Sequence, residues 1–241
     1  DVNIDTSSRN KAAVSVTGSG NTTIKLDGDN HLTGGNGIYS NSSGSLTISG
    51  DENDSLTAQG GDSRNGIYSV SGDVTISGGT VTATGGNSTG SYGSGGDGIH
   101  SGSLTVSGGT VNANGGNSGN GTYSGGGDGI ASGSLTVSDG TVNAKGGNCG
   151  NGNYSDGGNG ISSSGSLTIS GGTVDAKGGN SGNGNYSAGG NGIDNGGRSG
   201  SITISGGTVD AKGGNSGTGD YSNGGSGICN GGRRDRKSTR L

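Results

Sequence analysis

The chain has 241 residues and a net charge of −5, and only 22% of its residues are hydrophobic while 65 are glycine. No apolar stretch is long enough to cross a bilayer, so membrane insertion is not expected. The repeats are acidic and carry no basic patch, which argues against nucleic acid, because its binding requires phosphate neutralisation by Lys and Arg. Composition alone would indicate disorder, since few apolar residues are available to offset chain entropy.

A repeat of about 31 residues overrules that interpretation, because the few apolar residues recur at fixed places. Two clean copies are SGSLTVSGGTVNANGGNSGNGTYSGGGDGI and SGSLTVSDGTVNAKGGNCGNGNYSDGGNGI. One marker isoleucine identifies each unit: Ile38, Ile67, Ile99, Ile130, Ile161, Ile193 and Ile228. Such a chain stacks one unit along an axis, and each unit covers the apolar edge of its neighbour.

In chain order, residues 1–11 precede the pattern and are expected to form a strand or a cap. Residues 12–34 resemble a degenerate first coil, and the repeats then continue to residue 232. Residues 233–241 show no alternation, and from Asp235 onward they match the translation of a sequencing-library adapter. We therefore expect a disordered, non-native tail on a fragment of a longer protein.

Each repeat predicts three short strands, because apolar and polar residues alternate in three places. The first strand centres on Gly-Ile, the second on Leu-Thr-Ile or Leu-Thr-Val, and the third on Thr-Val-x-Ala. Glycine-rich pairs supply the corners between them. Winding three strands per coil pairs every strand with the next coil, about 4.8 Å away. The sequence thus predicts an all-β, right-handed parallel β-helix, a solenoid of about seven coils.

Five tyrosines stand at the same place in glycine-rich loops, seven residues before the marker isoleucine: Tyr92, Tyr123, Tyr154, Tyr186 and Tyr221. One interpretation is a ligand-binding aromatic strip on which sugar rings stack, with Asn and Asp offering hydrogen bonds to hydroxyls. The other is structural, because tyrosines one coil apart can pack on each other and close the loops against the coils. The sequence leaves both interpretations open.

A polar row precedes the marker isoleucines by two positions: Asn36, Asn65, Asp97, Asp128, Asn159, Asn191 and Ser226. Asn and Asp at a repeated turn commonly satisfy backbone donors through their side chains. The functional alternative is a calcium site, because hard cations take carboxylate and carbonyl oxygens as ligands. Asp97 and Asp128, on neighbouring coils, are the pair predicted to bind it.

Other candidates for function are weaker. Outward Ser and Thr of the second strand, such as Ser103 and Thr105, form a grid that resembles ice-binding solenoids, although any exposed strand favours these residues. The acids are scattered and the two histidines do not match in position, so we predict no catalytic residue, and a polysaccharide lyase remains a weak alternative. Cys149 and Cys229 lie in non-adjacent coils, too far apart for a disulfide.

The phrases GGDGIHSGSLTVSGGTVNANGG and GGDGIASGSLTVSDGTVNAKGG resemble the repeats of a family of secreted bacterial carbohydrate-binding-domain proteins. The resemblance covers residues 30–230 and implies a right-handed parallel β-helix that binds acidic pectic polysaccharide and calcium. The family's Asp-Asp-Gly-Ile is present here as Gly-Asp-Gly-Ile, at Asp97 and Asp128.

We therefore expect a non-catalytic, extracellular or cell-surface bacterial module that binds polysaccharide or acts as an adhesin. The main alternative is a passive structural stalk of a surface adhesin. An ice-binding protein and a polysaccharide lyase are the remaining ones.

Overall fold

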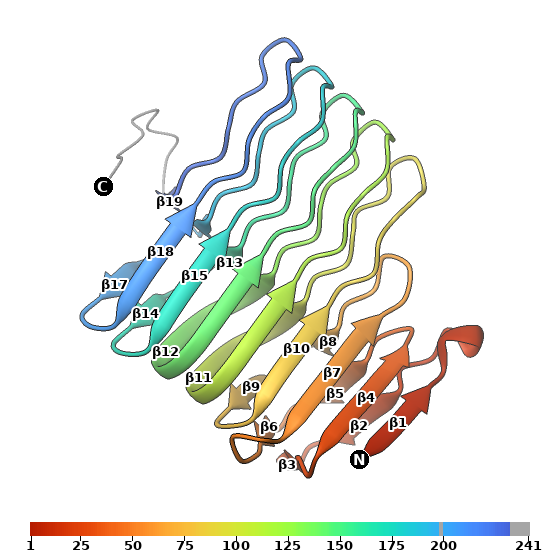
Figure 1. The fold of residues 1–241 in the computed structure, drawn as a ribbon, viewed down its shortest axis with the longest axis vertical. Helices are drawn as coiled ribbons and strands as arrows, with labels where there is room; N and C mark the ends of the chain where they lie inside the picture. The colour runs from red at the N-terminus through yellow and green to blue at the C-terminus, as the bar shows by residue number, and fades with distance from the viewer. Residues whose placement is uncertain (198–199, 232–241) are drawn as a thin grey trace.

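The computed structural model describes residues 1–197 and 200–231, which form a parallel β-solenoid of about seven coils (Figure 1). The predicted parallel β-helix is confirmed. Among these residues the one helical element is a short 3₁₀ turn, Ser7–Arg9 (η1), and no helix is long and apolar enough to cross a membrane. The tail expected at residues 233–241 lies outside the described residues. The described residues are nearly all strand and loop.

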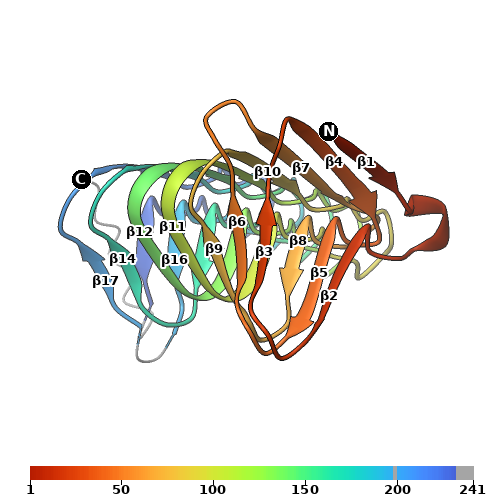
Figure 2. The same cartoon turned by 90° about the horizontal axis from the view of Figure 1, so that it is seen from below.

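Each coil presents three faces, and the strands of one face pair in parallel register from coil to coil (Figure 1, Figure 2). The first face holds β2 (Val14–Gly18), β5 (Ile38–Ser42), β8 (Ile67–Ser69), β13 (Ile161–Ser163), β16 (Ile193–Asn195) and β19 (Ile228–Asn230). The second holds β3 (Thr22–Lys25), β6 (Leu46–Ser49), β9 (Asp73–Ile76), β14 (Leu167–Ile169) and β17 (Ile202–Ile204). The third holds β1 (Val2–Asp5), β4 (Asp29–Gly34), β7 (Ser55–Gly60), β10 (Thr80–Thr84), β15 (Thr173–Lys177) and β18 (Thr208–Lys212).

Two coils differ from the expectation of three short strands, because β11 (Ile99–Asn114) and β12 (Ile130–Lys145) run unbroken through all three faces. These coils have the shortest connection between the marker isoleucine and the second-face strand. Pairing between the two coils therefore continues around both corners, with register shifts only near Ser107.

Residues 1–11 contribute β1 and then η1. β1 pairs in parallel with β4, and Ile4 lies opposite Leu32. The first strand of the chain thus extends the third face by one position at the N-terminal end of the rod.

The core is a set of inward rows that repeat from coil to coil. Ile99 pairs with Ile67 on one side and with Ile130 on the other, and all three are fully buried. The second face adds two inward apolar residues per coil, such as Leu104, and from β10 onward the third adds a valine and an alanine. Each large buried side chain contributes about 1.5–3 kcal/mol, so stability accumulates over the coils.

Long loops connect the third face of one coil to the first face of the next, and they project together from the rod (Figure 1). We call this layer the loop stack; it comprises residues 85–98, 115–129, 146–160, 178–192 and 213–227. The outgoing arm of each loop leaves the third face, the returning arm enters the first face, and the two kinds of arm alternate in the hydrogen bonding. The Gly147 N–H, on an outgoing arm, donates to Gly127 O at 2.8 Å, and the Gly158 N–H, on a returning arm, donates to Gly147 O at 2.9 Å. A Cβ atom on Gly147 would collide with the carbonyl oxygen of Gly116, so only glycine allows this approach.

Candidate functional site

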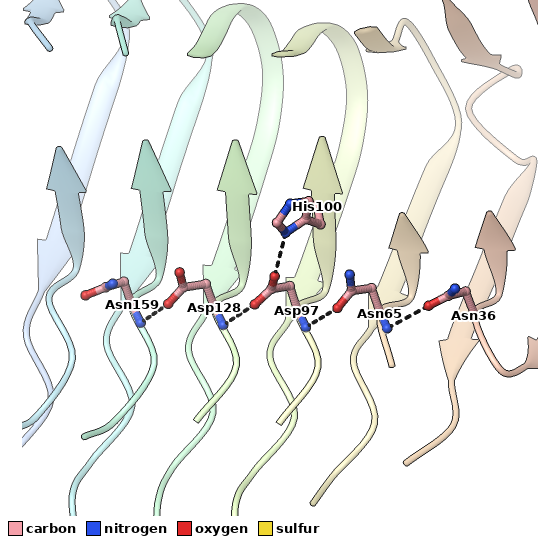
Figure 3. A network of polar contacts seen from close by, with 6 residues as sticks. All are labelled: Asn36, Asn65, Asp97, His100, Asp128 and Asn159. Carbon is pink, nitrogen blue, oxygen red and sulfur yellow. Dashed lines mark hydrogen bonds and ion pairs between the residues drawn. The ribbon is translucent and has the colours of Figure 1, made fainter. Parts of the chain in front are cut away.

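The polar row lies where each coil enters the first face, and its side chains point along the rod toward the next coil (Figure 3). Oδ1 of Asn65 accepts the backbone N–H of Asp97 at 2.7 Å, and Oδ1 of Asp97 accepts that of Asp128 at 2.8 Å. Oδ1 of Asp128 in turn accepts the N–H of Asn159 at 2.6 Å. These side chains therefore satisfy backbone donors, as expected of Asn and Asp, but the donors belong to the neighbouring coil.

Asp97 and Asp128 are neighbours in the polar row, and Asp97 also contacts a histidine. His100 Nδ1 lies 2.9 Å from Asp97 Oδ2, and this hydrogen bond raises the pKa of His100. Burial, together with the nearby Asp97 carboxylate, raises the pKa of Asp128 from 3.8 to about 7. His31 lies on β4 of the third face, opposite Thr57, so the fold does not bring the two histidines together.

The predicted calcium pair is adjacent in space but already occupied by protein contacts. Both oxygens of Asp97 and Oδ1 of Asp128 take part in the contacts just described. Calcium requires six to eight oxygen ligands, and no cluster of three or more His, Cys, Asp or Glu side chains occurs in the described part of the chain. The two carboxylates alone do not form a calcium site, and calcium binding stays a prediction.

A shallow pocket of about 330 Å³ lies beside the polar row, and sequence reasoning missed it. It is lined by Asn36, Ser63, Arg64, Asn65, Tyr68, Asp97 and His100. Tyr39, Tyr68 and His100 form an aromatic row on the first face, with ring centroids 5.8 and 5.1 Å apart. The available signal was their common place directly after a marker isoleucine, but aromatic rings stand there in only three units.

The structure brings the five predicted tyrosines together as one row at the tips of the loop stack. We call Tyr92, Tyr123, Tyr154, Tyr186 and Tyr221 the tyrosine row. Their ring centroids follow at 6.2, 5.0, 5.0 and 4.9 Å, and successive ring planes differ by only 3–12°. The rings thus stack on each other, and the faces of the three interior rings are turned toward neighbouring rings rather than solvent. At the interior rings the edges and hydroxyls stay open to a ligand, whereas stacking of a sugar on a ring face is open only at the outer faces of Tyr92 and Tyr221.

Packing alone does not account for tyrosine at these positions. All five residues have a left-handed backbone, with φ between 55° and 64°, and their side chains are 46–76% exposed. This backbone costs a bulky residue about 1–3 kcal/mol, whereas a stacked aromatic pair contributes about 0.5–1.5 kcal/mol. Glycine or asparagine would adopt the same backbone at lower cost.

The outgoing arms of the loop stack carry an inner and an outer row of exposed asparagines, and a further exposed pair, Asn153 and Asn185, directly precedes Tyr154 and Tyr186. The inner asparagine row is Asn87, Asn117, Asn148, Asn180 and Asn215, and the outer asparagine row is Asn120, Asn151 and Asn183. In both rows Oδ1 accepts the N–H of the next loop; Asn117 bonds Asn148 at 2.7 Å, and Asn151 bonds Asn183 at 2.9 Å. Within residues 1–197 and 200–231, no hydrogen bond uses the Nδ2 amides of these rows, so these donors face solvent.

Comparison of the chain with protein-family models, with curated proteins and with solved structures finds no match. The functional argument therefore rests on the side chains that the fold brings together.

Proposed function

We propose that the protein is a non-catalytic binding or adhesive module that attaches to polysaccharide through the outer edge of the loop stack. The observation that carries the proposal is the tyrosine row, in which exposed rings occupy an unfavourable backbone in five successive loops. Backbone strain that persists at exposed positions is a feature of functional sites.

A long polymer suits this edge better than a small ligand does. Each loop offers the same phenol hydroxyl and ring edge, and the outgoing arm that leads to each tyrosine carries an exposed asparagine of the inner row. A polysaccharide lying along the rod meets this set once per coil, so individually weak contacts add through effective concentration. Sugar hydroxyls both donate and accept hydrogen bonds, which fits phenols and free amides.

We place the module outside a bacterial cell, at the surface or secreted. The Asn-, Ser- and Gly-rich repeats and the resemblance to secreted carbohydrate-binding repeats support this location. The net negative charge of the chain favours solubility. It also disfavours binding of acidic glycans unless a cation such as calcium bridges the glycan and the protein.

A passive stalk is the second candidate, favoured by the continuous side-chain ladders that join each coil to the next. Stacked rings with covered faces and bonded polar side chains stiffen a rod without any ligand. A binding module is expected to retain a polysaccharide, whereas a passive stalk is not.

A glycan array probed with the purified chain tests the proposal. Retention on at least one polysaccharide is expected, and repeating the binding with a chelator decides whether calcium takes part. If no polysaccharide retains the chain with or without calcium, the binding function is wrong and the stalk remains.

A further inference from the structure

The tyrosine row places phenols at near-contact spacing in solvent. From Tyr123 to Tyr221 the centroids are 4.9–5.0 Å apart and the ring planes are within 10° of parallel. The exposed fractions of these side chains are about half or more. Diffusible reagents therefore reach every ring, and each ring has another phenol directly beside it.

The backbone fixes these neighbours in place. The Tyr154 N–H donates to Asn185 O at 2.9 Å, and the Tyr186 N–H donates to Asp220 O at 2.8 Å. With the equivalent bond of Tyr123, the three interior tyrosines are each bonded to the loop of the next coil. The left-handed backbone gives successive side chains the same direction. Two phenols held in this way have a high effective concentration for reaction with each other.

Composition leaves tyrosine as the main oxidisable group at the surface. The chain has no Trp and no Met, and two cysteines, of which Cys149 is buried in the loop stack. Cys229 is partly exposed on β19, and burial raises the pKa of its thiol, which lowers the thiolate fraction that oxidants attack.

We propose that the tyrosine row is an oxidative cross-linking site in which phenols of adjacent loops join as dityrosine. The oxidant is hydrogen peroxide used by a haem peroxidase. Each of two phenols loses one electron and one proton, the two ring carbons ortho to the oxygens form a bond, and their hydrogens move to the phenolic oxygens. The peroxide takes up the two electrons and two protons and leaves as two water molecules.

The product is a covalent tie between the tips of neighbouring loops, formed within one molecule. Ring stacking must give way at the linked pair, because a bond between ortho carbons tilts the rings out of the parallel arrangement. The tilt falls on exposed side chains, while the arms of the loops stay held together by backbone bonds such as that from Gly158 to Gly147.

The test treats the dilute full chain with peroxide and peroxidase and measures dityrosine fluorescence, with peptide mass spectrometry to locate the links. The expected result is links between row neighbours, such as Tyr154 with Tyr186, each with the loss of two hydrogens. The yield per chain should not change on dilution, because the reaction is intramolecular.

The double variant Tyr123→Phe, Tyr186→Phe leaves three row phenols but no adjacent pair, while every ring of the stack is retained. Its yield of dityrosine between row tyrosines, located by mass spectrometry, should fall by at least about tenfold, because the remaining row phenols are no longer neighbours. Links between Tyr39 and Tyr68, whose ring centroids are 5.8 Å apart on the first face, are counted separately. The matched control Tyr39→Phe, Tyr68→Phe removes the same number of phenols from the first face and should keep the wild-type yield of links between row tyrosines.

Three outcomes would overturn the proposal: no row links in the wild-type chain, links that form only between molecules, or an undiminished yield in the row variant. Circular dichroism of each variant confirms its fold. If the double variant does not fold, the mass-spectrometric map of the wild-type links decides alone. The test is independent of polysaccharide binding.

Discussion

Asp128 accepts the backbone N–H of Asn159 through Oδ1 across 2.6 Å, the same contact that Asn65 makes to Asp97 through its amide oxygen. The polar row therefore requires a side-chain oxygen acceptor at this position but not a negative charge. The carboxyl group of Asp128 is buried and lies near the Asp97 carboxylate, and these two effects raise its pKa to about 7.

Replacing Asp128 with asparagine should stabilise the fold at pH 8 and change little at pH 4. The raised pKa means that the folded state favours the protonated form of Asp128. The stability that this group contributes to the fold is therefore greatest below pH 3.8 and falls as the pH rises toward 7. Asparagine keeps the acceptor and never ionises. We expect a gain of about 2 kcal/mol at pH 8, less than the full shift implies because water reaches part of the carboxyl group. Chemical denaturation at the two pH values measures the difference.

The matched control is Asp139→Asn, which removes one charge from an exposed turn where Oδ1 accepts the N–H of Gly140. This variant should show no gain at pH 8. An equal gain in both variants would mean that net charge, and not the burial of Asp128 near Asp97, is responsible.

Ile130→Asp should unfold several coils together. Ile130 is fully buried and pairs with Ile99 and Ile161, so a charge at this position has no partner in a thin apolar core. The expected cost exceeds about 4 kcal/mol. Hydrogen exchange should show lost protection in β11, β12 and β13 at once, whereas loss confined to β12 would contradict cooperative stacking.

Gly147→Ala should loosen the loop stack and leave the coils folded. The added Cβ would collide with Gly116 O, and overpacking of this kind costs about 1–3 kcal/mol. Gly119→Ala is the control, because its Cβ would meet no atom closer than 3.5 Å. Exchange of loop amides such as that of Gly158 should accelerate in the first variant only. Equal protection in both would show that the arms are not held by close glycine contact.

Most of the fold follows from the sequence because the inward positions repeat with few changes, such as Asn30 opposite Leu56. Ile99 and Ile130 occupy equivalent places, and parallel pairing puts equivalent places one above the other. The long strands β11 and β12 were not predicted, since glycines at the corners indicated turns and not continued pairing. The bonding between loop arms was also missed, because glycine-rich segments without apolar alternation carry no strand signal.

The candidate site was predictable in position but not in geometry. The spacing of Tyr123 and Tyr154 before their marker isoleucines placed them in one row. Their left-handed backbone and covered ring faces depend on how the loops pack, which no spacing reveals. Asp97 and Asp128 were likewise placed on neighbouring coils, but the contact of Asp97 with His100 arises from a residue that recurs in no other unit.

The measurement that tests the proposed function most directly is polysaccharide retention by the triple variant Tyr123→Asn, Tyr154→Asn, Tyr186→Asn. Asparagine accepts the left-handed backbone, so relief of strain offsets the lost stacking, and the melting temperature should change by no more than about 4 °C. The control replaces three outward threonines of the second face, Thr105, Thr136 and Thr168, with asparagine. We expect retention on the polysaccharide that binds the wild-type chain to fall by at least about tenfold in the tyrosine variant and to persist in the control. Unchanged retention in the tyrosine variant would contradict the account, and lost stability with no binding in any form of the chain would identify the row as a structural element of a stalk.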